Sequence, residues 1–239
     1  MQLRSAALTD IGRIRRQNED RLMCDEALGL YGVADGVGGL PGGAEAAQCA
    51  VDQVHKLIRN SSNPPDLELI TLETNHAVSQ LGFRMSPHFG IGSTLTFGLF
   101  REGKVRLAHV GDSRCYVLKH GGELESLTMD HSVENEARAR RAKGELIWVN
   151  EQHRNALTRC IGQSTPLEVD LSTRPLEIGE RYLFCSDGVT RMIREEELAE
   201  HISRSDQPSD ILQEIIDLAN TRGGLDNATC VLVFVDHLP

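Results

Sequence analysis

Five aspartates lie beside the ends of predicted strands and are the residues best suited to chemistry: Asp20, Asp35, Asp112, Asp187 and Asp226. Taken singly, an aspartate next to glycine or asparagine is a common turn former that hydrogen-bonds its own backbone. Taken together, carboxylates brought to one place repel one another, and only protonation or a bound cation removes that repulsion. The set therefore predicts a metal site at the point where the strand ends meet.

The available ligands favour a hard ion. Carboxylate and carbonyl oxygens suit Mg²⁺ or Mn²⁺, which usually keep several waters in octahedral geometry. The six cysteines are scattered, without the close pair that a zinc ribbon or a redox motif needs. Six of the nine histidines are expected in helices or loops with no paired ligand spacing, and most are interpreted as surface residues: His55, His76, His88, His120, His201 and His237. Zinc is therefore disfavoured.

Two ions that share a carboxylate can hold a water, lower its pKa and direct it at phosphorus or a carbonyl carbon. The sequence has no Gly-x-Ser-x-Gly elbow, no cysteine before a phosphate-cradling loop and no P-loop, so it indicates no protein nucleophile. A cation near the metals must then bind the substrate. Arg13, Arg15 and Arg16 precede Asp20, and a guanidinium can grip two phosphate oxygens at once. A solvated basic face is the competing interpretation of these arginines.

Short apolar runs and hydrophobic periodicity predict the elements that position these residues. Residues 28–35 are an expected buried strand with Asp35 at its end, and the apolar spacing from Ala46 predicts an amphipathic helix. The next expected elements are a helix from 66 to about 83, a hairpin of strands 93–100 and 105–110, and a second hairpin turning at Gly121 and Gly122. The region 93–127 is therefore interpreted as an antiparallel meander.

The second half begins less regularly. Residues 129–165 are polar and predict a helix followed by an irregular insertion, of the kind that often borders an active site. The remaining expected elements are a strand ending at 186, helices at 195–202 and 211–219, and a closing strand at 228–235. The sequence shows no repeat or linker, so one domain over 1–239 is expected. Helices fall in groups between runs of strands, which favours an α+β fold over a doubly wound sheet.

Composition excludes several classes of protein. A formal net charge of -10 at pH 7, without a basic block, argues against a nucleic-acid surface. The residues are 40% hydrophobic, 25% charged and 4% aromatic, which is typical of a soluble enzyme. The N-terminal segment has charges throughout and lacks the apolar centre of a secretory signal, and no stretch approaches the roughly 20 apolar residues of a membrane span. A cytoplasmic protein with reduced cysteines is expected.

Eight short motifs occur in the order found in the type 2C, metal-dependent protein serine/threonine phosphatases: RRQNED, VADGVGG, GSTLTF, AHVGDSR, LTMDHS, LTRCIG, LFCSDGV and LDNATCVLV. The match spans nearly the whole chain, which is similar to a stand-alone bacterial catalytic domain of that family. The resemblance implies a sandwich of two antiparallel β-sheets flanked by pairs of α-helices. It also implies two Mn²⁺ or Mg²⁺ ions as cofactors, in a cleft at one edge between the sheets.

The resemblance also implies a set of metal ligands. By motif position, Asp35 bridges the two ions, and the backbone carbonyl of Gly36 is a further ligand. Asp187 and Asp226 hold one ion. Asp20 supports the other ion through a water. These roles agree with the carboxylate cluster but come from the resemblance.

Five further positions have implied roles or departures. Glu19 helps to order the water at the metals, and Arg15 matches the arginine that binds the substrate phosphate. Asp112 matches a residue that can hold a third metal in bacterial members. Arg191 stands where the family usually has an aspartate of that third site, so the third ion is expected to be weak or absent, with substrate contact as an alternative role for Arg191. Val37 stands where animal relatives carry a histidine proposed as general acid, so the leaving-group proton must come from water or elsewhere.

The resemblance suggests substrates as well. Residues 129–165 fall where the family has its flap, a region thought to shape the choice of protein substrate. Phosphorylated proteins are the implied substrates, commonly a Ser/Thr kinase and its targets, and some members of the family serve secretion signalling. A monomer is expected, without nucleic acid or a membrane span. Two alternatives stay open: a non-catalytic phosphoprotein-binding module of the same fold, and a small-molecule phosphoesterase.

Overall fold

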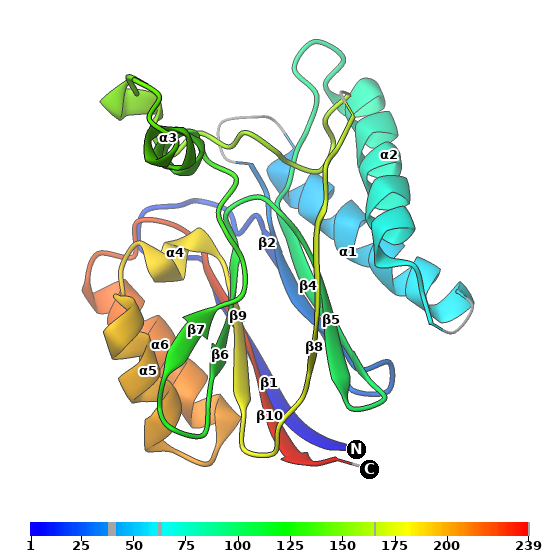
Figure 1. Ribbon diagram of the computed structural model, residues 1–239. Coiled ribbons are helices and arrows are strands. Elements are labelled where there is room, and N and C mark those ends of the chain that lie inside the picture. The colour runs from blue at the N-terminus through cyan, green and yellow to red at the C-terminus, as the bar shows by residue number, and fades with distance from the viewer. Residues whose placement is uncertain (38–41, 62–63, 165, 239) are drawn as a thin grey trace.

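The computed structural model describes residues 1–37, 42–61, 64–164 and 166–238. Two five-stranded antiparallel sheets face each other (Figure 1). The strand order of the first sheet is β1 (Gln2–Asp10), β10 (Ala228–His237), β9 (Arg181–Cys185), β6 (Arg114–Leu118) and β7 (Leu124–Ser126). The order of the second is β2 (Asp20–Asp25), β3 (Leu30–Asp35), β4 (Leu95–Arg101), β5 (Lys104–Val110) and β8 (Asp170–Pro175).

A pair of helices covers the outer face of each sheet (Figure 1). The second sheet carries α1 (Gly43–Asn60) and α2 (Leu67–Met85), and the first carries α5 (Glu195–Arg204) and α6 (Pro208–Thr221). The short α4 (Asp187–Thr190) follows β9, and α3 (Val133–Ala142) projects from one end of the sandwich with a 3-10 turn at Glu151–His153. The expected α+β sandwich with flanking helix pairs is confirmed.

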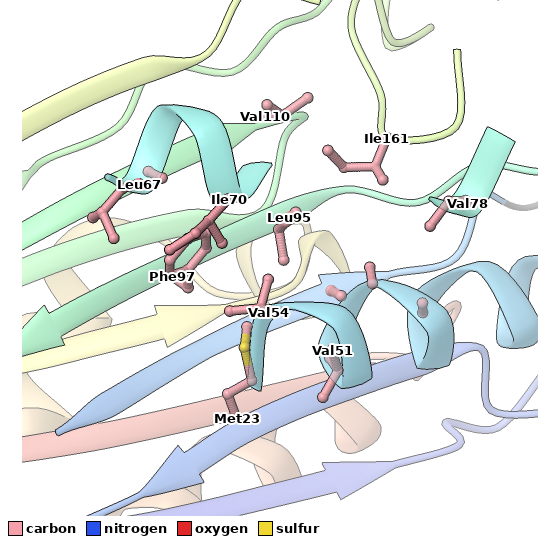
Figure 2. Packing of buried hydrophobic residues seen from close by; sticks show 14 of the residues in the cluster. Met23, Val51, Val54, Leu67, Ile70, Val78, Leu95, Phe97, Val110 and Ile161 are labelled. Carbon is pink, nitrogen blue, oxygen red and sulfur yellow. The ribbon is translucent and has the colours of Figure 1, made fainter. Parts of the chain in front are cut away.

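Apolar layers hold these elements together. Between the sheets, the ring of Phe100 packs edge-on against Tyr31 and Tyr182, with centroid distances of 5.4 and 5.1 Å. Successive side chains of a strand point to opposite faces, so Leu30 and Ala34 of β3 face the helices instead. Figure 2 shows this helix-facing layer, whose labelled members are Met23, Val51, Val54, Leu67, Ile70, Val78, Leu95, Phe97, Val110 and Ile161.

Local sequence explains how α1 and α2 are placed. The buried face of α1 includes Ala46, Ala47 and Ala50, small side chains that let the helix lie close to the sheet. Asp66 caps α2, since its carboxylate accepts a hydrogen bond from the backbone N–H of Leu69 at 3.0 Å. Both helices lie close to their predicted bounds.

One expectation about the sheets is wrong. The two hairpins of region 93–127 form as predicted, but they do not continue one meander, because β5 pairs with β8 while β6 pairs with β9 in the facing sheet. The chain crosses between the sheets at 111–113, where Gly111 adopts a φ of 113° that favours glycine. Both hairpins bury apolar faces. A strand pattern does not say which of two facing sheets a strand joins.

Three strands are absent from the sequence-based expectations, β1, β2 and β8. All three lie at a sheet edge, and most of their residues are half-buried or exposed. An edge strand buries less of its side chains, so its apolar alternation is weak. Among the described residues, no helix is both long and apolar enough to cross a membrane.

Candidate metal centre

Two of the predicted aspartates are neighbours in the second sheet. Asp20 is the first residue of β2 and Asp35 is the last residue of β3, and the two are directly paired in the antiparallel ladder. Directly opposite residues in such a ladder have Cα atoms about 4.5 to 5.5 Å apart. The register of this hairpin therefore puts two carboxylates side by side.

The facing sheet contributes at the same end of the sandwich. Asp187 begins α4 just after β9, and Asp226 lies just before β10, the antiparallel neighbour of β9. Asp112 lies in the crossing between the sheets. These three and Asp35 line one cleft of about 430 Å³, while Asp20 is 2% exposed and lies behind it. The fold therefore unites all five aspartates predicted from the sequence.

Burial and mutual repulsion give these carboxyls unusual proton affinities. Burial, followed by the charges of Asp20 and Asp187, raises the pKa of Asp35 well above its ordinary value. Burial and the charge of Asp112 raise the pKa of Asp187 to about 7. Burial also raises the pKa of Asp112 to about 6 and that of Asp20 above its usual range. Such a cluster is stabilised by positive charge.

The free oxygen atoms fit a hard cation. Asp20 Oδ2 accepts a hydrogen bond from the Ser186 hydroxyl at 2.7 Å, but Asp20 Oδ1 is buried without a hydrogen-bond partner. Asp187 Oδ1 is also buried without a partner. Buried carboxylate oxygens that lack donors are costly in a protein and are the preferred ligands of Mg²⁺ and Mn²⁺. The donor set therefore fits the two-ion expectation.

The guanidiniums of Arg15 and Arg191 bring positive charge to the carboxylates of the cleft. Arg15 Nη2 lies 2.7 Å from Asp226 Oδ2. Arg191 forms an ion pair with Asp187, and its Nη1 lies 3.8 Å from Asp226 Oδ2. No group of three or more His, Cys, Asp or Glu side chains in the described part of the chain already has metal-binding spacing. The arginines thus balance part of the carboxylate charge.

Glu19 and Gly36 also lie at the cleft, as expected. The backbone N–H of Gly36 donates to the carbonyl of Glu19 at 3.2 Å, and burial raises the pKa of the Glu19 carboxyl. A Cβ atom on Gly36 would lie 2.4 Å from the carbonyl carbon and oxygen of Gly43, at the start of α1. Only glycine therefore lets the backbone pass at this point.

Sequence reasoning missed the residues that hold the site together. The amide of Asn227 accepts from the Glu19 backbone N–H at 2.8 Å and donates to the carbonyls of Ile11 and Gln17 at 2.9 and 3.0 Å. It thereby fixes the loop that carries Arg15 against the strand end that carries Asp226. The only available signal was its position next to that aspartate in the LDNATCVLV motif.

Two buried histidines were also missed. The rings of His109 and His131 lie 4.7 Å apart, and both residues are at most 5% exposed. His131 Nδ1 accepts from the Gly111 backbone N–H at 3.1 Å, and the His131 backbone N–H donates to the Gly111 carbonyl at 2.8 Å. The pair therefore fastens the start of segment 129–165 beside Asp112. The six histidines interpreted earlier as mostly surface residues are exposed or half-buried.

Segment 129–165 reaches the mouth of the cleft. Asn155, Ala156, Leu157 and Cys160 line it, while α3 lies further out (Figure 1). The helix followed by an irregular stretch is confirmed for the described residues 129–164, and residue 165 lies outside them. The segment therefore forms one wall of the cleft that the aspartates line.

A cleft that gathers carboxylates between two antiparallel sheets, with guanidiniums beside them, suits a metal-dependent phosphate-ester hydrolase. A family model described as protein phosphatase 2C matches residues 7–228. A protein phosphatase 2C-type of Streptococcus pyogenes is 35% identical over 235 residues, which are 94% of either chain. The chain therefore belongs to the protein phosphatase 2C family, as its motifs indicated.

Two solved structures are similar over nearly their whole length. PppA, a key regulatory component of T6SS in Pseudomonas aeruginosa, has a TM-score of 0.84 and 29% identity, with 97% of either chain covered. The catalytic domain of the serine threonine protein phosphatase PstP, in complex with two manganese ions, also has a TM-score of 0.84 and 29% identity, covering 98% of this chain and 99% of that one. The agreement in length extends the family assignment to almost all of the chain.

Proposed function

We propose that this chain hydrolyses phosphoserine and phosphothreonine on proteins with the help of two divalent ions, Mn²⁺ or Mg²⁺. The observation that carries the proposal is the five-aspartate cluster, in which Asp20 Oδ1 and Asp187 Oδ1 are buried without hydrogen-bond partners. The manganese complex of PstP, which has the same fold, supports the choice of ion. Family membership supports the reaction class.

The chain offers a distinct ligand set for each ion. Asp35 would lie between the two ions, with the backbone carbonyl of Gly36 as a further ligand. Asp187 and Asp226 would hold one ion, and Asp20 would act on the other through a water. When bound, the ions supply an activated water for in-line attack on phosphorus. The carboxylates themselves hold the ions and need not act as nucleophiles.

Other cleft residues bind substrate and water. Arg15 approaches from the loop between β1 and β2 and would grip the phosphate oxygens, because a guanidinium matches two of them at once. Glu19, beside Gly36, would order a water of the metal site. Val37 lines the cleft without a transferable proton, so solvent would protonate the leaving serine or threonine oxygen. Because Arg191 lies beside Asp187, we propose two ions and no stable third ion at Asp112.

Exposed apolar side chains near the cleft favour protein substrates over small metabolites. Segment 129–165 borders the cleft through Asn155, Ala156 and Leu157, and its Trp148 and Leu146 side chains are almost fully exposed. We therefore propose phosphorylated proteins, including a Ser/Thr kinase and its targets, as substrates. The similarity to PppA keeps a role in secretion signalling as a narrower version of this proposal.

We further propose that the chain acts in the cytoplasm as one monomeric domain. All six cysteines are free, and three of them are buried, as suits a reducing compartment. Both sheets share one inter-sheet core, which supports a single folding unit, including a flap at 129–165. Each outer sheet face is already covered by its own helix pair, which supports a monomer.

The decisive experiment is hydrolysis of a phosphothreonine peptide and of p-nitrophenyl phosphate, with Mn²⁺, with EDTA, and with an Asp35→Asn variant. We expect turnover that requires metal and is lost in the variant, which should still fold because Asn keeps the shape of the side chain. A folded protein that binds the peptide without turnover in any metal would instead be a phosphoprotein-binding module. Turnover of small phosphates alone would identify a small-molecule phosphoesterase.

A further inference from the structure

Arg191 is an arginine with an unusual set of partners. It follows α4, four residues after Asp187, and its side chain is 43% exposed and lines the cleft. Its ion pairs are with Asp187 and, at 3.8 Å, with Asp226. Both partners are proposed ligands of the metal ions. Arg191 is therefore balanced by carboxylates that a bound ion would also use.

Arginines outside the cleft are held differently. Arg114 Nε and Nη2 each lie 2.7 Å from one oxygen of Asp130, so a single carboxylate satisfies the fork. Arg222 makes the same kind of two-pronged contact with Glu197, at 2.8 and 2.6 Å. These pairs lie outside the cleft and have no competing cation. Among the contacts of the described residues, Arg191 has no carboxylate partner that is not also a proposed metal ligand.

Charge balance gives Arg191 a function. When fully ionised, the five aspartates and Glu19 with two divalent ions carry two net negative charges, which repel a phosphate dianion. Arg15 reduces this to one net negative charge, and Arg191 brings it to zero. Both guanidiniums lie within 4 Å of the same oxygen, Asp226 Oδ2, at 2.7 and 3.8 Å, so they approach the site together. The net negative charge that repels a dianion is removed only when both arginines contribute.

We propose that Arg191 is a second phosphate-binding arginine, which Asp187 and Asp226 hold while metal is absent. Ions on these carboxylates take over the charge that Arg191 balanced, and the guanidinium becomes free to bind the phosphate monoester beside Arg15. The proposal rests on the metal site proposed above. It makes Arg191 a competitor of the ions and a partner of the substrate, two properties that separate measurements detect.

The test compares Arg191→Gln and Arg191→Lys with a matched control, Arg194→Gln. The Arg194→Gln substitution removes the same charge three residues away. The Arg194 side chain is 78% exposed and pairs with Glu197 outside the cleft. Inorganic phosphate binding is measured by calorimetry at saturating Mn²⁺, Mn²⁺ binding by calorimetry without phosphate, and hydrolysis with the phosphothreonine peptide. The unfolding temperature of each variant confirms that it folds.

For Arg191→Gln we expect the dissociation constant of phosphate and the KM of the peptide to rise by about tenfold or more, since a charge-assisted hydrogen bond is lost. The kcat should change less. Mn²⁺ should bind more tightly, because an internal competitor is gone. Arg191→Lys should fall between, and Arg194→Gln should match the parent. Unchanged phosphate affinity in Arg191→Gln, or weaker Mn²⁺ binding, would overturn the proposal. Absence of Mn²⁺ binding in the parent chain would instead refute the metal site.

Discussion

Removing one charge from the aspartate cluster should stabilise the metal-free protein and abolish its response to metal. The informative substitution is Asp187→Asn, because burial and the charge of Asp112 raise the pKa of Asp187 to about 7 in the folded chain. An ordinary aspartate has a pKa of about 4. The folded state therefore holds this proton more tightly than the unfolded state does.

The sign and size of the effect follow from proton linkage. A raised carboxyl pKa means that the folded state loses stability as the pH rises from about 4 to about 7, and no further above that range. A difference of about three powers of ten in proton affinity corresponds to about 4 kcal/mol at alkaline pH, and less than half of this remains at about pH 5. Relative to the parent, Asp187→Asn should thus gain about 2 to 3 kcal/mol between about pH 5 and about pH 8.

The variant must be compared with the parent because two buried histidines change the unfolding free energy with pH in the opposite direction to Asp187. Burial, together with the charge of His131, lowers the pKa of His109 to about 4, and burial lowers that of His131. Their protonation in the unfolded state reduces stability as the pH falls through the range from about 6.5 to about 4. Both proteins contain these histidines, so the difference between their unfolding free energies cancels the contribution.

The assay is urea unfolding of both proteins in EDTA at about pH 5 and about pH 8, repeated with Mn²⁺. The parent should gain stability from Mn²⁺ at the higher pH, and Asp187→Asn should gain little. A difference between variant and parent that does not change with pH would show that Asp187 is ordinarily acidic in the folded chain. That result would remove the electrostatic argument for the cluster.

Two further substitutions test the geometry. Gly36→Ala should lower the free energy of unfolding by about 1 to 3 kcal/mol and weaken Mn²⁺ binding, because its Cβ would lie 2.4 Å from the backbone of Gly43. Its control is Gly121→Ala, which has open space around it and should change neither the unfolding free energy nor the calorimetric Mn²⁺ affinity. Asp130→Asn should lower the free energy of unfolding by about 1 to 3 kcal/mol and speed hydrogen exchange in 129–165, because it breaks the half-buried two-pronged pair with Arg114. Its control is Glu145→Gln, which breaks an exposed pair with Arg140 and should lower the free energy of unfolding by less than about 0.5 kcal/mol. Equal effects in a substitution and its control would contradict the contact on which that prediction rests.

The strand that carries Asp35 to the cleft could be predicted from the local apolar pattern of the sequence. The run that ends at Asp35 is apolar throughout, and its buried strand and terminal carboxylate are present as expected. Periodicity likewise predicted α1 and α6 and the apolar face that each buries. These predictions succeed because burial of one face leaves a repeat in the sequence that needs no knowledge of the partner.

The pairing of distant segments could not be read in this way. The crossing at 111–113 sends β6 into the facing sheet, and nothing in the hairpin pattern distinguishes that route from a meander. Asn227 holds the loop of Arg15 through hydrogen bonds to backbone groups more than 200 residues away, and such bonds have no sequence period. Local residues give each candidate group its type, but only packing decides which groups meet.

The sequence by itself predicted the ligand chemistry proposed for this protein, with oxygen donors for a hard ion and arginines for phosphate, and it contained the motif order of the protein phosphatase 2C family. The tertiary structure alone decided the charge state of the site. Asp187 and Arg191 are four residues apart, yet the raised pKa of Asp187 and the shared contact of both arginines with Asp226 depend on burial between two sheets. Electrostatic energies depend on distance and on access to water, and these are properties of the folded chain.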